Sequence, residues 1–350
     1  MKYRHNSFAI GRMAALTASL LCAALILEAR AQTTQPAATQ PAGMPSTQPA
    51  APPIVAVWYQ PIRSFPRWKA AGVNTLVGYE SEGGTVSVQQ YCDAAAAAGL
   101  RVVLQWGGGG DVQARAIADP NVIGVINGPD EPDGNGATAP NQMIVQFNAI
   151  KQVCPKPVWE NFDGRKMQWL PEASYVLYAQ SCDVLCMDDY PLNYGDGVAA
   201  IPTITARLQE LQRVSNGKPV LAFLECSNQN LSIQNWVVGT ALAATMRGPT
   251  AAEFGTELDA ALAAHPAGIG FFPDVIGLGF QSYDGVPNDV NAVLTTRSLA
   301  LTAAAQGAAV LATTQPATLP RSQSTTQPAT VDLSGTQVIV NGQTYYLRKQ

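Results

Sequence analysis

Eight short apolar runs alternate with segments of helical periodicity between residues 54 and 311. The runs are apolar throughout rather than at every second position, which is typical of strands buried on both faces of a parallel sheet. We predict these strands at Ile54–Gln60, Val73–Tyr79, Arg101–Trp106, Val122–Asn127, Pro157–Asn161, Val184–Asp188, Pro219–Glu225 and Gly268–Pro273.

The intervening segments have the periodicity of helices that connect parallel strands. They lie at Val86–Ala98, Val112–Ala118, Asn141–Val153, Met167–Gln180, Thr203–Val214, Ala251–Ala264 and Val290–Leu311. Eight such units over residues 54–311 fit the roughly 250 residues of a (β/α)8 TIM barrel. The main alternative is an open doubly wound sheet, but Gln60-Pro61-Ile62-Arg63 after the first strand is not the glycine-rich phosphate turn of that fold.

The predicted barrel is flanked by segments of different composition. Residues 32–53 and 312–332 are Thr-Gln-Pro-Ala repeats, which have too little apolar surface to offset the entropy of ordering, so we expect disordered linkers. Residues 333–350 carry Asn341-Gly342 between two β-prone runs and predict a small β-hairpin. Since a lone hairpin is marginal in water, we expect it to dock on another surface.

The N-terminal residues 1–31 have the pattern of a secretory signal peptide. Lys2 and Arg4 make the start basic, Met13–Leu27 is mainly apolar, and Ala29-Arg30-Ala31 fits a cleavage site. An uncleaved membrane anchor is the alternative, but the apolar run is shorter than the roughly 20 residues that span a bilayer. We therefore expect export to the periplasm, cell envelope or medium, with no stable membrane span after cleavage.

Composition removes several classes of function. The 350-residue chain is 47% hydrophobic and 13% charged, and its net charge of -4 provides no basic surface for nucleic acid. Its two histidines, His5 and His265, leave little material for a Ser-His-Asp hydrolase or a multi-histidine zinc enzyme. We expect no cofactor and no metal.

Five cysteines follow the predicted leader, and an odd number leaves at least one without an intramolecular partner. They are Cys92, Cys154, Cys182, Cys186 and Cys226. None belongs to a C-x-x-C pair, so buried thiols are favoured over a zinc site, while disulfide pairing stays open.

In a β/α barrel the carboxyl ends of the strands open into one pocket. The predicted strand ends are rich in carboxylates, amides and aromatic rings, which bind sugars by accepting hydroxyl protons and stacking on apolar CH faces. The candidate binding residues are Trp58, Trp106, Asp130, Asn161, Asp188, Tyr190, Trp236 and Asp274. Glu131 and Glu225 end the fourth and seventh strands, and two facing carboxylates are the chemical minimum for cleaving a glycosidic bond.

Asp130-Glu131-Pro132 after strand four and Glu225 at the end of strand seven resemble the clan of retaining glycoside hydrolases built on a β/α barrel (clan A). Arg247-Gly248-Pro249-Thr250 and the last strand are also similar to that clan, and the resemblance covers residues 54 to about 290. It implies hydrolysis of O-glycosidic bonds in oligo- or polysaccharides, with Glu131 as acid/base and Glu225 as nucleophile. A retaining pair has its carboxyl groups about 5–5.5 Å apart.

The chain departs from the clan at Asp130, where the clan usually has asparagine. An asparagine amide can donate to a sugar hydroxyl, whereas an ionised aspartate can only accept. A negative neighbour also raises the pKa of Glu131. The sugar that is bound stays open.

Structural roles are the alternatives at several of the site residues. Glu131 could belong to an acidic turn, Glu225 could pair with Arg165 or Arg247, and Asp188 could bind loop backbone. Trp106, Tyr190 and Trp236 could serve packing instead of sugar binding. Glu131, Asp133 and Asn135-Gly136 resemble a calcium loop only faintly, because Gln142 replaces the bidentate glutamate.

Two other classes of function compete with a glycosidase. The aromatic rim and Asp130 are compatible with a non-catalytic carbohydrate-binding barrel. The proline-rich flanks and the hairpin are compatible with a structural cell-envelope protein.

Overall fold

The computed structural model describes residues 53–134, 138–227, 246–273, 285–314, 337–340 and 343–346, with side chains of the last barrel helix described to residue 303. Several predictions fall outside these residues: the leader, the linkers apart from Pro53 and residues 312–314, Asn135-Gly136, Trp236, Asp274 and the Asn341-Gly342 turn. Residues 312–314, which were predicted as linker, continue the last barrel helix.

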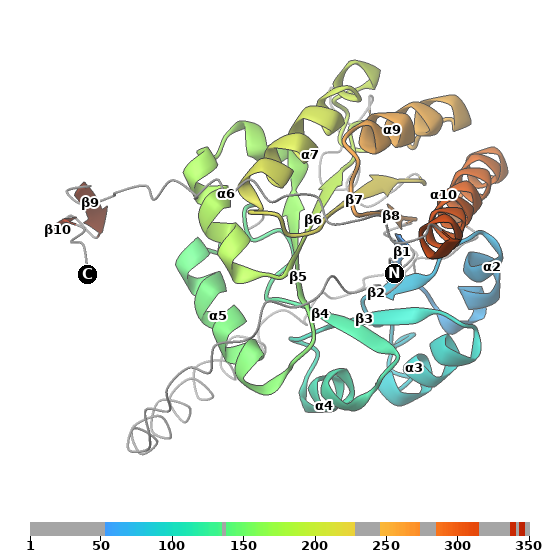
Figure 1. Cartoon of the computed structure of the whole chain (residues 1–350), viewed down its shortest axis with the longest axis horizontal. Coiled ribbons are helices and arrows are strands. Elements are labelled where there is room, and N and C mark those ends of the chain that lie inside the picture. The colour runs from blue at the N-terminus through green and yellow to red at the C-terminus, as the bar shows by residue number, and fades with distance from the viewer. Residues whose placement is uncertain are drawn as a thin grey trace, which may run out of the picture. The chain divides into compact units, whose positions relative to one another are not determined.

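Eight parallel strands pair in chain order and close into a barrel (Figure 1). They are β1 (Ile54–Trp58), β2 (Thr75–Val77), β3 (Arg101–Gln105), β4 (Val122–Ile126), β5 (Val158–Asp163), β6 (Val184–Asp189), β7 (Val220–Glu225) and β8 (Gly268–Phe272). β1 pairs with both β2 and β8, with Ala56 opposite Thr75 on one side and Gly270 on the other. The predicted (β/α)8 TIM barrel is confirmed.

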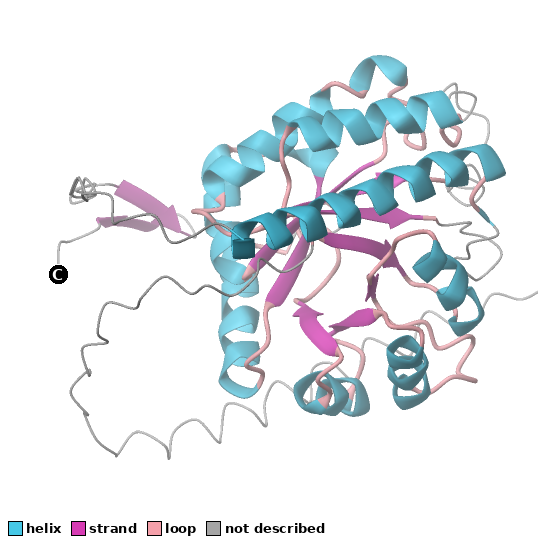
Figure 2. Ribbon diagram, turned by 45° about the vertical axis from the view of Figure 1, so that its right-hand side comes forward, coloured by secondary structure: helices cyan, strands magenta, loops and turns pink. Residues whose placement is uncertain are grey.

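Helices surround the strands on the outside, as Figure 2 shows with helices in cyan and strands in magenta. They are α2 (Phe65–Ala70), α3 (Val88–Ala97), α4 (Gly110–Ala118), α5 (Pro140–Val153), α6 (Glu172–Tyr178), α7 (Thr203–Val214), α9 (Ala251–Ala263) and α10 (Asn288–Thr314). Among the described helices, none combines the length and apolar character needed to cross a membrane.

Two helix predictions were wrong. The single helix expected at Met167–Gln180 is interrupted: a 3₁₀ turn at Gly164–Gln168 precedes α6, and Pro171 stands at the N-cap of α6. Proline has no N–H to continue a helix and its ring clashes with the preceding turn, so the two pieces cannot join. Helix α2 was missed because its six residues are too few to show a 3.6-residue period.

The strands separate two apolar cores. One lies inside the barrel and includes Trp58, Trp159 and Phe223, and the other lies between the strands and the helices. In β7, Leu221 and Phe223 belong to the inner core, whereas Ala222 and Leu224 belong to the outer core. This alternation explains why the strand is apolar at successive positions.

The five cysteines of the barrel are all buried and free of disulfides. The sequence-based expectation of buried thiols is confirmed. Burial raises the pKa of the Cys182, Cys186 and Cys226 thiols, so these thiols stay protonated and unreactive.

Near the C-terminus, β9 (Gln337–Val340) and β10 (Gln343–Tyr346) pair antiparallel, with Val340 opposite Gln343. The predicted hairpin is therefore present as a pair of strands on either side of Asn341-Gly342.

Two glycine substitutions, one in the inner core and one on helix α9, should have opposite effects on the stability of the fold. A Cβ added at Gly270 would lie 2.0 Å from the Phe223 ring, whereas one at Gly255 in α9 meets its nearest neighbour, Val293, at 3.9 Å. Gly270→Ala should lower the free energy of unfolding by about 1–3 kcal/mol through overpacking. Gly255→Ala should raise it by about 0.5–1 kcal/mol through helix propensity. Urea unfolding of both variants measures the two signs, and equal effects would contradict this account of the inner core.

Candidate active site

The carboxyl ends of β4, β5 and β6 bring four predicted site residues together. The Asn161 amide nitrogen donates to Asp130 Oδ1 and to Asp188 Oδ2, both at 3.0 Å. The Asp188 side chain is hydrogen-bonded to Glu131. Asp130, Glu131, Asn161 and Asp188 therefore form one connected group, which we call the carboxylate cluster.

Glu131 occupies a backbone conformation that non-glycine residues rarely adopt. Its φ of 49° lies in the left-handed region, directly after β4 and the short turn that follows it. The turn is held by hydrogen bonds from the Gly134 N–H to the Glu131 carbonyl at 2.9 Å and from the Thr138 N–H to the Pro132 carbonyl at 2.8 Å. Residues in sparsely populated backbone conformations that surrounding contacts hold in place are concentrated at functional sites.

Burial raises the pKa of Glu131 to about 7, and the negative charges of Asp130 and Asp163 add to the effect. The hydrogen bond with Asp188 acts in the opposite direction. Burial also raises the pKa of Asp188, as does the charge of Glu131. Two carboxyl groups in hydrogen-bond contact cannot readily both ionise, so Glu131 and Asp188 share a proton near neutral pH.

Two further carboxylates brace the turn around Glu131. The Asp163 N–H donates to Asp133 Oδ1 at 3.1 Å, and the Tyr175 hydroxyl donates to Asp133 Oδ2 at 2.7 Å. Asp163 Oδ1 in turn accepts from the Arg165 N–H at 2.9 Å. Tyr175 was not predictable from the sequence, because its contact with Asp133 forms only where α6 packs against the turn after β4.

Among the residues that the structure describes, no group of three or more histidine, cysteine, aspartate or glutamate side chains is arranged to hold a metal ion.

A column of aromatic rings lies beside the carboxylate cluster. Tyr190 stacks on Phe272 with centroids 5.6 Å apart and on Tyr194 with centroids 6.0 Å apart. The Arg165 guanidinium lies 4.5 Å from the Tyr194 ring centroid. Tyr190 is only 3% exposed and Tyr194 is partly exposed, so Tyr194 presents the more accessible ring. Tyr194 was not among the predicted binding residues, although an aromatic residue four positions after Tyr190 in a proline- and glycine-containing loop is a usable signal.

Two of the three tryptophans predicted to bind substrate lie in the described residues, and both contact the apolar cores. Trp58 is 4% exposed and its ring lies 5.1 Å from Phe223 inside the barrel. Trp106 is partly buried and packs against the outer core. These contacts favour structural roles for both rings.

Glu225, the predicted nucleophile, is enclosed by the loop that follows β6. Its Oε1 accepts from the Leu192 N–H at 2.8 Å, and its Oε2 accepts from the Asn193 N–H at 2.7 Å. The Asn193 side-chain amide also donates to Oε2, and the Glu225 side chain has no exposed surface.

The arginines considered as partners of Glu225 have other carboxylate partners. Arg165 pairs with Asp196 at 2.8 Å, and Arg247 pairs with Glu253 at 2.6 Å.

A second carboxyl pair joins Glu225 to Glu257 of α9 through a side-chain hydrogen bond. Burial raises the pKa of Glu257 strongly, and the charge of Glu225 raises it further. Burial also raises the pKa of Glu225, while the N–H groups of Leu192 and Asn193 favour its ionised form. Glu257 therefore keeps its proton and donates it to Glu225. The sequence signal that was missed is a glutamate on the buried face of α9, beside Phe254, Leu258 and Ala261.

The contacts of the two predicted catalytic glutamates lie on different elements. Those of Glu131 run to β5 and β6, and those of Glu225 run to the loop after β6 and to α9. The retaining separation of the two carboxyl groups stays a prediction.

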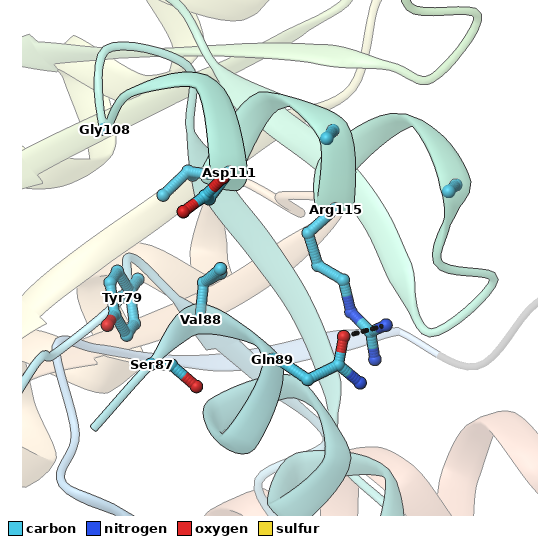
Figure 3. Close-up of a pocket in the computed structure, with 10 residues that line it drawn as sticks. Tyr79, Ser87, Val88, Gln89, Gly108, Asp111 and Arg115 are labelled. Atoms are coloured by element: carbon cyan, nitrogen blue, oxygen red, sulfur yellow. Dashed lines mark hydrogen bonds between the residues drawn. The ribbon is translucent and has the colours of Figure 1, made fainter.

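A separate pocket of about 590 Å³ lies between α3 and α4 (Figure 3). Its wall includes Tyr79, whose hydroxyl donates to the Val86 carbonyl, and Ser87, which caps α3. Arg115 donates to Gln89 at 2.7 Å and to Asp93 at 2.6 Å. Because these polar groups bond to one another, this pocket offers less for catalysis than the carboxylate cluster.

Comparison with known proteins relates the fold to other barrels. No protein-family model matches the chain, and no curated protein matches its sequence. Among solved structures, the chain is similar to a β-galactosidase from the psychrophilic Marinomonas ef1, with a TM-score of 0.54, 11% identity and coverage of 75% of this chain and 62% of that one.

Two further solved structures have lower TM-scores. A glycoside hydrolase family 17 β-1,3-glucanosyltransferase from Rhizomucor miehei has a TM-score of 0.43 and 15% identity, with coverage of 62% of this chain and 85% of that one. A xylanase from Cellvibrio japonicus, a thermostable mutant, has a TM-score of 0.43 and 14% identity, with coverage of 71% and 98%. At these identities the similarity shows the β/α barrel fold that this chain shares with the β-galactosidase.

The pair of buried glutamates predicts that Glu257→Gln stabilises the protein near neutral pH. The folded chain holds a proton on Glu257 that the unfolded chain releases, and each pH unit between the two pKa values costs about 1.4 kcal/mol of stability. A glutamine still donates to Glu225 without needing that proton, so we expect a gain of about 1–3 kcal/mol near neutral pH that vanishes in acid.

Urea unfolding at two pH values measures this gain. Because the folded protein binds more protons than the unfolded chain, the wild type should lose stability as pH rises, and the variant should lose less. A variant less stable than the wild type near neutral pH would show that Glu257 is ionised in the fold. Glu172→Gln, at an exposed position of α6, is the matched control.

Proposed function

We propose that the chain is a glycoside hydrolase that cleaves O-glycosidic bonds in oligo- or polysaccharides. The observation that carries the proposal is Glu131: a buried carboxyl group at the carboxyl end of β4, in a strained turn, whose pKa lies near 7. A general acid must hold its proton near the working pH and still release it, and this environment provides that property. The position of Glu131 after β4 supports the proposal, because enzymes with this fold carry their active sites at the carboxyl ends of the strands, while the fold alone does not define an activity.

In the proposed reaction Glu131 donates its proton to the glycosidic oxygen as the bond to the anomeric carbon breaks. Glu225 attacks that carbon and forms a glycosyl-enzyme ester. Glu131, now ionised, then takes a proton from water as the water oxygen displaces Glu225 and releases the sugar. The products are two sugars with retained anomeric configuration and an enzyme in its starting protonation state.

This assignment places a demand on the loop that holds Glu225. A nucleophile must have an oxygen that the anomeric carbon can reach, but the Glu225 side chain has no exposed surface and is covered by the loop that carries Leu192 and Asn193. Catalysis through Glu225 therefore requires this loop to move aside when substrate binds.

The enclosed state of Glu225 favours a second candidate, a non-catalytic carbohydrate-binding barrel. Such a protein would use the carboxylate cluster and the Tyr194 ring to bind sugars and would release no reducing ends.

We further propose export by the leader at residues 1–31, which would bring either activity to extracellular glycans.

The general-acid role predicts that Glu131→Gln lowers kcat by about 10²–10⁴-fold. With aryl glycosides that have acidic leaving groups, the variant should lose less of its kcat, because such a leaving group departs without being protonated. Since the acid acts in its protonated form, wild-type activity should fall as pH rises through about 7. Steady-state rates across pH for Glu131→Gln and for the control Glu172→Gln provide the measurement. A full wild-type rate in Glu131→Gln would exclude the role.

The nucleophile is identified in the unaltered protein with a 2-deoxy-2-fluoro glycoside, which traps the glycosyl ester. We expect peptide mass spectrometry to locate the label on Glu225. A label on Asp188 would transfer the nucleophilic role to the carboxylate cluster. Oligosaccharide binding without any label or any hydrolysis across a broad panel would favour the binding barrel.

A further inference from the structure

The carboxylate cluster offers a ligand hydrogen-bond acceptors far more than donors. Its one amide donor, Asn161 Nδ2, is already used by Asp130 and Asp188. All other polar side-chain atoms of the cluster are carboxyl or amide oxygens. The proton that Glu131 and Asp188 share lies between these two side chains, so it is not available to a ligand. A ligand group that binds here directly must therefore donate.

The cationic side chains that act on the edge of this cluster already interact with other groups of the protein. Three cations lower the pKa of the adjacent Asp163, namely Arg165, Lys166 and Arg207. Arg165 pairs with Asp196 at 2.8 Å, Arg207 pairs with Asp189 at 2.6 Å, and Lys166 lies 5.1 Å from the centroid of the Trp169 ring. An anionic sugar would meet carboxylates at this site, and the two arginines are already paired with carboxylates of the protein.

A buried acceptor without a partner gives independent evidence for a missing donor. Within the described part of the chain, Asn161 Oδ1 is buried and has no hydrogen-bond partner, and Asn161 is only 2% exposed. The bonds from its Nδ2 to two carboxylates fix which end of the amide is the oxygen, because only an NH₂ group can donate to both. A buried acceptor of this kind destabilises the fold until a donor binds to it.

We propose that the substrate carries a free amino group beside the scissile bond, so that the enzyme acts on glycans containing unacetylated amino sugars. This rests on the proposed glycosidase function and specifies its substrate. A protonated amine has three N–H donors and one positive charge. It can donate to Asp130 and Asn161 Oδ1 while its charge offsets that of the cluster, which a hydroxyl or an acetamide cannot do. Asp130 is the specificity-determining residue.

A divalent cation is the other chemistry that oxygen atoms of this kind can bind. The arrangement of acidic side chains in the described residues does not form a metal-binding group, so the amine is favoured. Calcium is nevertheless included as a competing ligand in the test.

The experiment compares three β-1,4-linked hexamers that differ at one substituent: glucosamine, N-acetylglucosamine and glucose, with a galacturonate hexamer as the anionic probe. Binding to the full chain is measured by calorimetry at about pH 6, below the ordinary pKa of an amine. We expect the glucosamine hexamer to bind at least about tenfold more tightly than the glucose hexamer, with a preference that weakens as salt is added.

Asp130→Asn removes the charge but keeps an oxygen that accepts from Asn161, so the fold should be preserved. The ratio of the two affinities should fall at least about threefold in this variant. Asp259→Asn, at an exposed position of α9 that pairs with Arg297, is the matched control and should keep the wild-type ratio. It reports any general attraction of amines to an acidic protein.

Every other outcome of these measurements contradicts the inference. Equal or tighter binding of the glucose or galacturonate hexamer overturns it, as does an unchanged ratio in Asp130→Asn. One calcium ion bound in the wild type and lost in Asp130→Asn would reassign the acceptors to a metal. If neutral glycans are hydrolysed in a Glu131-dependent way without amine preference, the glycosidase stands and this inference falls. No binding and no hydrolysis of any hexamer would reject both.

Discussion

The pairing of β1 with β8 is the constraint on which the remaining structure depends. It removes both sheet edges and points the carboxyl ends of all eight strands in one direction, so that residues far apart in the chain meet there. Asp130, Asn161 and Asp188 are separated by about thirty positions from one to the next, yet one amide bridges the two carboxylates. Inner-core packing maintains this closure, since Phe223 occupies the space that a side chain at Gly270 would need.

Burying carboxyl groups together forces them to share protons, and the molecule does this in two places. Glu131 and Asp188 share a proton at the ends of β4 and β6, where an exchangeable proton is chemically useful. Glu225 and Glu257 do so between β7 and α9, where the bonded N–H groups of the β6 loop make the arrangement rigid. The first pair has the properties of a reactive centre. The second has those of a structural anchor, and it must loosen if Glu225 is to act as a nucleophile.

The element pattern was predictable because burial on both strand faces leaves a local record. Continuous apolar runs located all eight strands to within a few residues, and Thr203–Val214 was predicted with its observed bounds. Local rules failed where a short or proline-interrupted segment is stabilised by packing, as in α2 and around Pro171. Sugar binding by Trp58 and Trp106 stays a prediction: both rings pack in or against a core, and an aromatic residue near a strand end can point into a core as readily as into a cleft.

The sequence by itself determined the fold class and the composition of the strand ends, because hydrophobic periodicity and chain length leave few other architectures. It also identified Glu131, Asp188 and Asn161 as candidates. Only the tertiary structure decided which of them touch, since hydrogen bonds between strands depend on register and closure. The same holds for the environment of each carboxylate: Glu225 is enclosed by the β6 loop and Glu257, and Asn161 Oδ1 is left without a partner in the described residues. Burial and neighbouring charge, which set the protonation of these groups, are properties of three-dimensional packing and not of the local sequence.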